Sequence, residues 1–208
     1  MKRFLFLAVL SLVPAASSFA QRTAPQFEVF GGATWIRADI SPDLKAFGLS
    51  HVNATGWNAS ATENVNSWFG GTLDFSGVYS RPTITDPVTG ATFSNQINAS
   101  AYTFLFGPSF AYRRGRRIVP FGRVLLGAAN ARASTTSQGA LAIGTAAKSS
   151  DTRFALAAGG GADILVSRSI ALRGTADWIR STFNDFGDDR QNNLRISVGV
   201  VFRWSPER

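Results

Sequence analysis

The chain has 208 residues, no cysteine, a single histidine and a formal net charge of +8 at pH 7. The missing cysteines exclude a disulfide scaffold, a thiolate metal site and a cysteine nucleophile, and the single histidine excludes any site that needs two imidazoles. With 45% hydrophobic and 16% charged residues and a mean hydropathy of +0.03, the chain is too apolar to be disordered and too polar for a multi-helix membrane protein.

Residues 1–20 have the pattern of a secretory signal peptide. Lys2 and Arg3 precede an apolar run, and small residues at Ser18 and Ala20 provide a cleavage site. The run is too short to span a bilayer as a helix, and a buried N-terminal helix is the alternative. Cleavage after Ala20 would leave residues 21–208 as one exported domain.

The rest of the chain alternates between apolar and polar residues in eight segments, which predicts eight strands. They cover residues 26–36, 57–66, 72–80, 101–112, 118–132, 154–166, 170–178 and 194–204. Phe30 and Ile36 break the alternation of the first segment. Strands in globular proteins have about five or six residues, whereas a tilted strand that crosses a bilayer needs about 9–11. The longer segments here therefore favour membrane strands.

The breaks between these segments alternate in length. Residues 67–70, 113–117 and 167–169 form short breaks, and residues 38–55, 81–97, 133–151 and 182–190 form long ones. Short turns on one side and long loops on the other are typical of outer-membrane barrels. The sequence therefore predicts an all-β fold, an eight-stranded antiparallel up-and-down transmembrane β-barrel with both termini in the periplasm.

The charged residues of the strands predict the content of the lumen. A spanning sheet must close, and eight strands leave an interior that side chains can fill. The face opposite the apolar stripe should hold a structural network of salt bridges, because unpaired charges there would be costly. Its members are Glu28, Asp74, Arg123, Arg153, Asp163, Arg173, Asp177 and Arg195. A proton or ion path is the alternative. Glu63 falls on the lipid-facing side, so either a bulge shifts the register or Glu63 lies at headgroup level.

Several short motifs carry a resemblance to a known family. They are Gly56-Trp57-Asn58-Ala59-Ser60, Asn64-Val65-Asn66-x-Trp68-x-Gly70, Asp74-Phe75-Ser76-Gly77, Phe104-Leu105-Phe106-Gly107-Pro108, Pro120-Phe121-Gly122, Gly159-Gly160-Gly161-x-Asp163 and Gln191-Asn192-Asn193-Leu194-Arg195. In this order and spacing they resemble bacterial outer-membrane β-barrel-domain proteins, the small eight-stranded barrels that include the outer-membrane protein A barrel, its X relative and the opacity proteins.

The resemblance covers essentially the whole mature chain. It implies an integral outer-membrane protein of a Gram-negative-type cell, with no catalytic residues to carry over. Such barrels typically end on an aromatic residue that the barrel-assembly machinery reads. Trp204 matches that residue, although Ser205-Pro206-Glu207-Arg208 follows it.

Aromatic and basic residues mark the expected membrane interfaces. Two aromatic belts are predicted, because such rings favour the headgroup level. Their members are Trp35, Trp57, Tyr79 and Trp178 near the outer ends of strands, and Trp68, Tyr112 and Trp204 near the inner ends. The basic turn Arg113–Arg117 is expected to anchor in headgroups rather than bind nucleic acid. Arg37, Arg132 and Arg180 could contact lipopolysaccharide phosphates or remain ordinary solvated charges.

No catalytic, cofactor or metal site is predicted. His51, in the first long loop, is the only candidate histidine base, and Ser50 beside it lacks a nucleophile-elbow pattern. Asp185, Asp188 and Asp189 lack the spacing of an EF-hand loop. We therefore expect a monomeric, porin-like but non-catalytic barrel with a structural, adhesion or surface-interaction role, whose partners are outer-membrane lipids. A barrel enzyme acting on lipid or protein, a soluble lipocalin-like carrier and a narrow small-solute pore are the alternatives.

Overall fold

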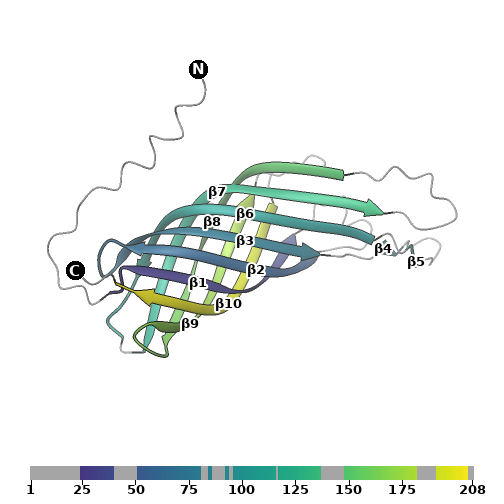
Figure 1. The fold of residues 1–208 in the computed structure, drawn as a ribbon. Helices are drawn as coiled ribbons and strands as arrows, with labels where there is room; N and C mark the ends of the chain where they lie inside the picture. Colours follow the sequence, from purple (N-terminus) through teal and green to yellow (C-terminus); the bar gives the residue numbers. More distant parts are fainter. Residues whose placement is uncertain are drawn as a thin grey trace, which may run out of the picture.

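The computed structural model describes residues 24–39, 51–80, 84–85, 92–93, 96–115, 117–136, 148–181 and 191–205. Eight long strands form one closed antiparallel barrel (Figure 1). They are β1 Phe27–Asp39, β2 His51–Asn64, β3 Phe69–Ser80, β6 Gln96–Ala111, β7 Ile118–Thr136, β8 Lys148–Leu165, β9 Ile170–Ser181 and β10 Gln191–Trp204. Each pairs with the next along the chain, and β10 pairs with β1, so the predicted up-and-down fold is confirmed.

The two ends of the barrel differ in the connections they carry. At the end that holds both Ala24 and Ser205, called the inner end below, the connections are the short stretches 65–68, 112–117 and 166–169 (Figure 1). The side chains of Asn66 and Ser167 accept backbone N–H groups within two of these turns, which closes them tightly. At the outer end, β4 (Ile84–Thr85) and β5 (Thr92–Phe93) pair in the connection between β3 and β6.

Several strands extend farther toward the outer end than the alternation predicted. β2 begins at His51, paired with Asp39, so the predicted loop 38–55 is shorter than expected. β7 and β8 remain paired as far as Ser134 and Lys148. Both faces are polar along the β8 extension, residues 148–153, so the alternation disappears there although the backbone pairing continues. Residues 40–50, 137–147 and 182–190, which contain Asp185, Asp188 and Asp189, lie outside the described residues, as does the proposed signal peptide.

The two faces of the sheet have opposite chemistry. Large apolar side chains such as Phe75, Phe104 and Leu172 are exposed on the outside, and polar side chains are buried inside. Among the described residues, no helix is long and apolar enough to cross a membrane.

The lumen also contains apolar layers that the alternation did not predict. Phe30 and Ile36, which broke the pattern of the first strand, are buried on the inward face of β1. Phe30 packs with Ala171 and Val201. A second buried cluster comprises Leu105, Leu125, Ala129, Ala155, Ala157 and Ile179. Apolar residues on the strand face that was expected to be polar therefore belong to the packed interior.

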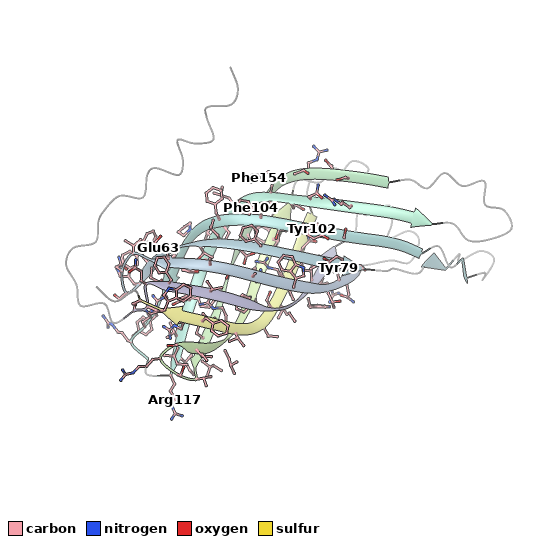
Figure 2. All side chains as sticks on the ribbon, viewed as in Figure 1. Glu63, Tyr79, Tyr102, Phe104, Arg117 and Phe154 are labelled. Carbon is pink, nitrogen blue, oxygen red and sulfur yellow. The ribbon has the colours of Figure 1, made fainter. Side chains whose placement is uncertain are left out.

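The register settles the position of Glu63. Glu63 pairs with Phe27 on one side and with Gly71 on the other, and both ladders run through it without a shift. A bulge is therefore excluded. The side chain is exposed on the outside at the inner end of β2, one residue before the strand ends (Figure 2). Of the two alternatives, a position at headgroup level is the one that the register leaves.

Candidate functional site in the lumen and at its rims

Four buried charges form a closed ring in the middle of the lumen, called the central ring below. Arg195 on β10 contacts Asp74 and Asp177 at 2.8 and 2.9 Å, through Nη1 and Nη2 respectively. Arg123 on β7 contacts the same two carboxylates at 3.1 and 2.7 Å. Each carboxylate thus meets two guanidinium groups, and the ring is neutral. All four side chains are essentially excluded from solvent, which makes the pairing a condition of the fold.

Gly159 lets two of these residues meet across an intervening strand. In the register, Arg123 of β7 lies beside Gly159 of β8, which lies beside Asp177 of β9. With no side chain on Gly159, the Arg123 Nε donates to Asp177 Oδ1 at 3.0 Å. A Cβ atom at this position would lie 2.6 Å from that same oxygen and 2.3 Å from the carbonyl oxygen of Ala176. The contact between Arg123 and Asp177 therefore depends on the absence of a side chain at Gly159.

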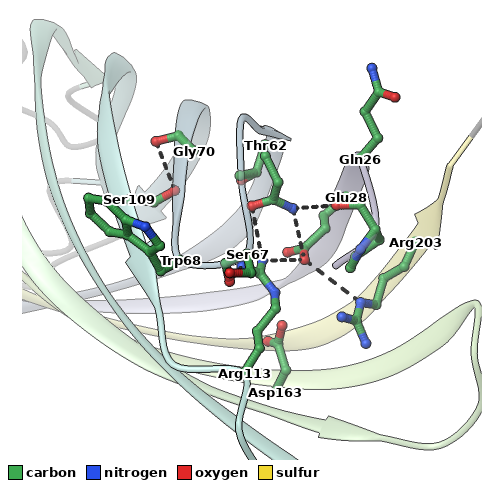
Figure 3. Close-up of polar contacts among 12 residues, drawn as sticks. Gln26, Glu28, Thr62, Ser67, Trp68, Gly70, Ser109, Arg113, Asp163 and Arg203 are labelled. Atoms are coloured by element: carbon green, nitrogen blue, oxygen red, sulfur yellow. Dashed lines mark hydrogen bonds and ion pairs between the residues drawn. The ribbon is translucent and has the colours of Figure 1, made fainter. Parts of the chain in front are cut away.

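A second group of charges, called the inner cluster, closes the lumen at the inner end (Figure 3). It consists of Glu28, Arg113, Asp163, Arg173 and Arg203. Arg173 binds Asp163 at 2.6 Å and Glu28 at 2.7 Å. Arg113 reaches in from the β6–β7 turn and donates to Glu28 at 2.9 Å, to Asn64 at 2.9 Å and to the Ser67 carbonyl at 2.8 Å. This side chain ties two turns and β1 together beneath the lumen.

Aromatic rings hold the central arginine of the inner cluster in place. The Arg173 guanidinium lies 4.6 Å from the centre of the Phe121 ring and 5.9 Å from that of Phe30. Guanidinium groups stack favourably on aromatic faces, particularly when both are desolvated. The apolar Phe30 therefore serves the ion network as well as the apolar packing.

The structure places seven of the eight predicted network residues in the lumen and one outside it. Arg153 shares the inward parity, but it lies on the outer extension of β8, where its side chain is 43% exposed and pairs with Asp151 at 2.8 Å. The position of a residue in the alternation shows whether its side chain points inward, but not how far along the barrel axis it lies. The prediction that Arg153 belongs to the lumen network is therefore wrong.

Two members of the inner cluster were missed. Arg203 follows the inward parity of Arg195 and could have been included on that ground. Arg113 was predicted to anchor in headgroups, and this is wrong because its guanidinium is turned into the lumen. Residues in a turn do not follow the alternation of a strand, so no signal in the sequence indicates that the Arg113 side chain points inward. Arg114 and Arg117 of the same turn are exposed, as the prediction requires of anchoring residues (Figure 2).

Little open space remains between the two groups of charges. A cavity of about 20 Å³ is lined by members of both, among them Glu28, Arg123 and Arg173. This is room for about one water molecule. This cavity is too small for a larger solute.

The aromatic residues predicted for the belts all lie on the outside or in a turn. Trp57, Trp68, Tyr79, Tyr112, Trp178 and Trp204 are exposed, and Trp35 is partly covered. At the inner end, Trp204 stacks on Phe27 and Trp68 on Phe110. At the outer end, the Tyr79 and Tyr102 hydroxyls lie 3.3 Å apart (Figure 2).

No cluster suited to metal binding occurs in the described part of the chain. No three carboxylate, histidine or cysteine residues there come close enough to hold a metal ion. Each of the four lumen carboxylates is bound by arginine, so none is available as a general base. His51, predicted to lie in a loop, is instead the first residue of β2; its side chain lies outside the described set.

A family model for the outer membrane protein beta-barrel domain matches residues 5–202. The chain belongs to this family. It is an outer-membrane β-barrel, and the predicted family and location are confirmed. A comparison with curated protein sequences gives no significant match.

Solved structures similar to this outer-membrane barrel share its fold. Neisserial surface protein A is 15% identical, with a TM-score of 0.60 over 87% of this chain and 99% of that one. Ail, the attachment invasion locus protein of Yersinia pestis, is 18% identical, with a TM-score of 0.53 over 86% and 99%. OprG from Pseudomonas aeruginosa is 14% identical, with a TM-score of 0.51 over 89% and 98%.

Proposed function

We propose that this outer-membrane barrel is a non-conducting, non-catalytic protein with a structural or surface-contact role. The filled lumen carries this proposal. Four carboxylates and five arginines pair inside it, and a cavity of about 20 Å³ remains. Contacts with other molecules then belong to the rims, the exterior and the outer connections. Because arginine binds every one of these four carboxylates, none of them is free to serve as the base of a barrel enzyme.

We expect no single-channel conductance from the purified barrel in planar lipid bilayers, because the central ring and the inner cluster block the lumen. A variant with residues 40–50, 137–147 and 182–190 replaced by short turns should be equally silent, since the block lies in the strands. A large porin serves as the positive control. Conductance steps in the wild type would contradict the proposal, and steps in the shortened variant alone would move the block to the outer connections.

The same shortened variant tests the surface-contact role. Ail is named for attachment and invasion, and for this chain attachment is part of the proposal. Cells expressing the shortened variant should adhere less to coated surfaces than cells expressing the wild type. Heat-modifiable migration on SDS gels checks that equal amounts of folded barrel are present. Equal adhesion would remove surface contact from the proposal and leave the structural role.

The outer rim offers a site for the phosphate groups of outer-leaflet lipids, lipopolysaccharide among them. Arg132 is exposed, and its Nε donates to Asn130 Oδ1 at 3.0 Å while its guanidinium lies 5.9 Å from the centre of the Tyr102 ring. These contacts fix a cation beside the outer belt, where lipid phosphates lie. Arg132 forms no salt bridge with a carboxylate of the described ranges. Arg132 is therefore suited to a phosphate group.

Three further features complete the proposal. Residues 1–20 act as a cleaved signal peptide, which the order of basic, apolar and small residues supports. Trp204, exposed at the end of β10 and stacked on Phe27, presents the aromatic residue that the assembly machinery reads. The barrel acts as a monomer, because its outward apolar face is suited to lipid on every strand.

A further inference from the structure

The inner cluster contains one more positive than negative charge. Its two carboxylates are already engaged, because Arg173 binds both oxygens of Asp163 and one oxygen of Glu28. The other Glu28 oxygen accepts from Arg113 at 2.9 Å and from Asn64 at 3.3 Å. Arg203 comes last, with its Nε 3.7 Å from this same oxygen. One arginine of the cluster is therefore left without a carboxylate of its own.

Arg203 is buried as well as poorly paired. The residue is 7% exposed, and its Nε has no hydrogen-bond partner among the described residues. Figure 3 shows that the contact of Arg203 with Glu28 runs through Nε. A buried guanidinium needs both a counter-charge and acceptors for its N–H groups. The described residues supply neither in full.

An open cleft adjoins Arg203 at the inner mouth of the barrel. Its volume is about 770 Å³, and its lining includes Arg168, Ser167 and Ser205. Ser167 and Ser205 each use Oγ to accept a backbone N–H, so the hydroxyl protons remain available to donate. No carboxylate lines this cleft within the described residues. The lining thus offers two cations and hydroxyl donors, which is the chemistry that recognises an oxyanion.

We propose that the inner mouth of the barrel binds an oxyanion of the phosphate class between Arg203 and Arg168. The anion neutralises the excess charge of the inner cluster and accepts the hydrogen bonds that Arg203 cannot place on Glu28. A free phosphate and the phosphate of an inner-leaflet lipid share this chemistry. The site lies at the opposite end of the barrel from the outer connections and is independent of the role proposed for them.

Binding is tested with inorganic phosphate on the full mature barrel in neutral detergent micelles, at ionic strength held constant with potassium chloride. We expect saturable binding by calorimetry and a phosphate-dependent rise in Tm. Arg203→Gln should weaken binding by at least about tenfold, because a charge-assisted contact is lost. Arg168→Gln should weaken it less, because Arg168 is exposed. Arg153→Gln, which removes an exposed arginine at the outer end, is the matched control and should bind like the wild type.

A second readout separates binding from a purely structural effect. Arg203→Gln removes a buried charge that is only weakly paired with Glu28, so its Tm without phosphate should equal or exceed that of the wild type, and phosphate should no longer raise it. Wild-type protein that does not bind phosphate, or an Arg203→Gln variant that binds equally well, would overturn the proposal. A Tm that responds equally to chloride would overturn it too.

The lipid arm identifies the source of the anion. The barrel is also measured in nanodiscs of phosphatidylglycerol. If the Tm of the wild type there exceeds that of the Arg203→Gln variant and does not change when phosphate is added, the anion is a lipid headgroup. A barrel that still responds to free phosphate there indicates a soluble anion. Either result supports the site, and stability that is equal in both variants under all conditions contradicts it.

Discussion

Replacing Arg195 with alanine should destabilise the folded barrel by about 3–5 kcal/mol, because the change leaves Asp74 and Asp177 buried with one guanidinium between them. Urea unfolding in lipid vesicles, followed by tryptophan fluorescence, measures this loss. Arg195→Lys keeps the charge but cannot contact both carboxylates through one planar fork, so its loss should be intermediate.

Arg153→Ala is the matched control for Arg195→Ala. It also removes an arginine from an ion pair, but the partner, Asp151, is 46% exposed. Exposed pairs contribute about 1 kcal/mol or less, so this variant should unfold close to the wild type. If the two variants lost equal stability, the central ring would have no special part in the fold.

Gly159→Ala should cost about 3 kcal/mol or more, although it adds a single methyl group. The new Cβ would lie 2.3 Å from the Ala176 carbonyl oxygen and 2.6 Å from Asp177 Oδ1. Backbone pairing between β8 and β9 and the Arg123–Asp177 contact must therefore shift together. The same urea titration measures the loss, and heat-modifiable migration reports whether the variant still closes.

Gly174→Ala provides the comparison on the neighbouring strand. A Cβ atom at Gly174 would have no neighbour within 4 Å, so its stability should remain within about 0.5 kcal/mol of the wild type. A Gly159→Ala variant as stable as this one would show that the ring does not depend on the missing side chain.

The fold could be predicted from the sequence because membrane strands leave a strong periodic signal. Lipid outside and a polar lumen inside impose a period of two, and the turn lengths fix the topology. The same alternation indicates which charged side chains point inward, and Arg203 shares the inward face of β10 with Arg195. Phe30 shows the limit of the pattern, since it is apolar and still faces the lumen.

The rest of the site depends on depth and register, which parity does not contain. Arg153 points in the right direction but lies beyond the lumen. Arg113 is in a turn, where no periodicity applies. The role of Gly159 appears only when the ladders place it between Arg123 and Asp177. The spacing of residues along the chain does not reveal that Arg123 of β7 and Asp177 of β9 meet across β8.

The position of Arg195 in the chain has a consequence for the order in which the barrel completes itself. β10 is the last strand, and its Arg195 contacts Asp74 of β3 and Asp177 of β9. A sheet that lacks β10 holds both aspartates against Arg123 alone and keeps an excess negative charge on the face that becomes the lumen. Arrival of the final strand thus pairs β10 with β1 and neutralises the central ring in the same event, so partly assembled barrels lack the stability of the closed one.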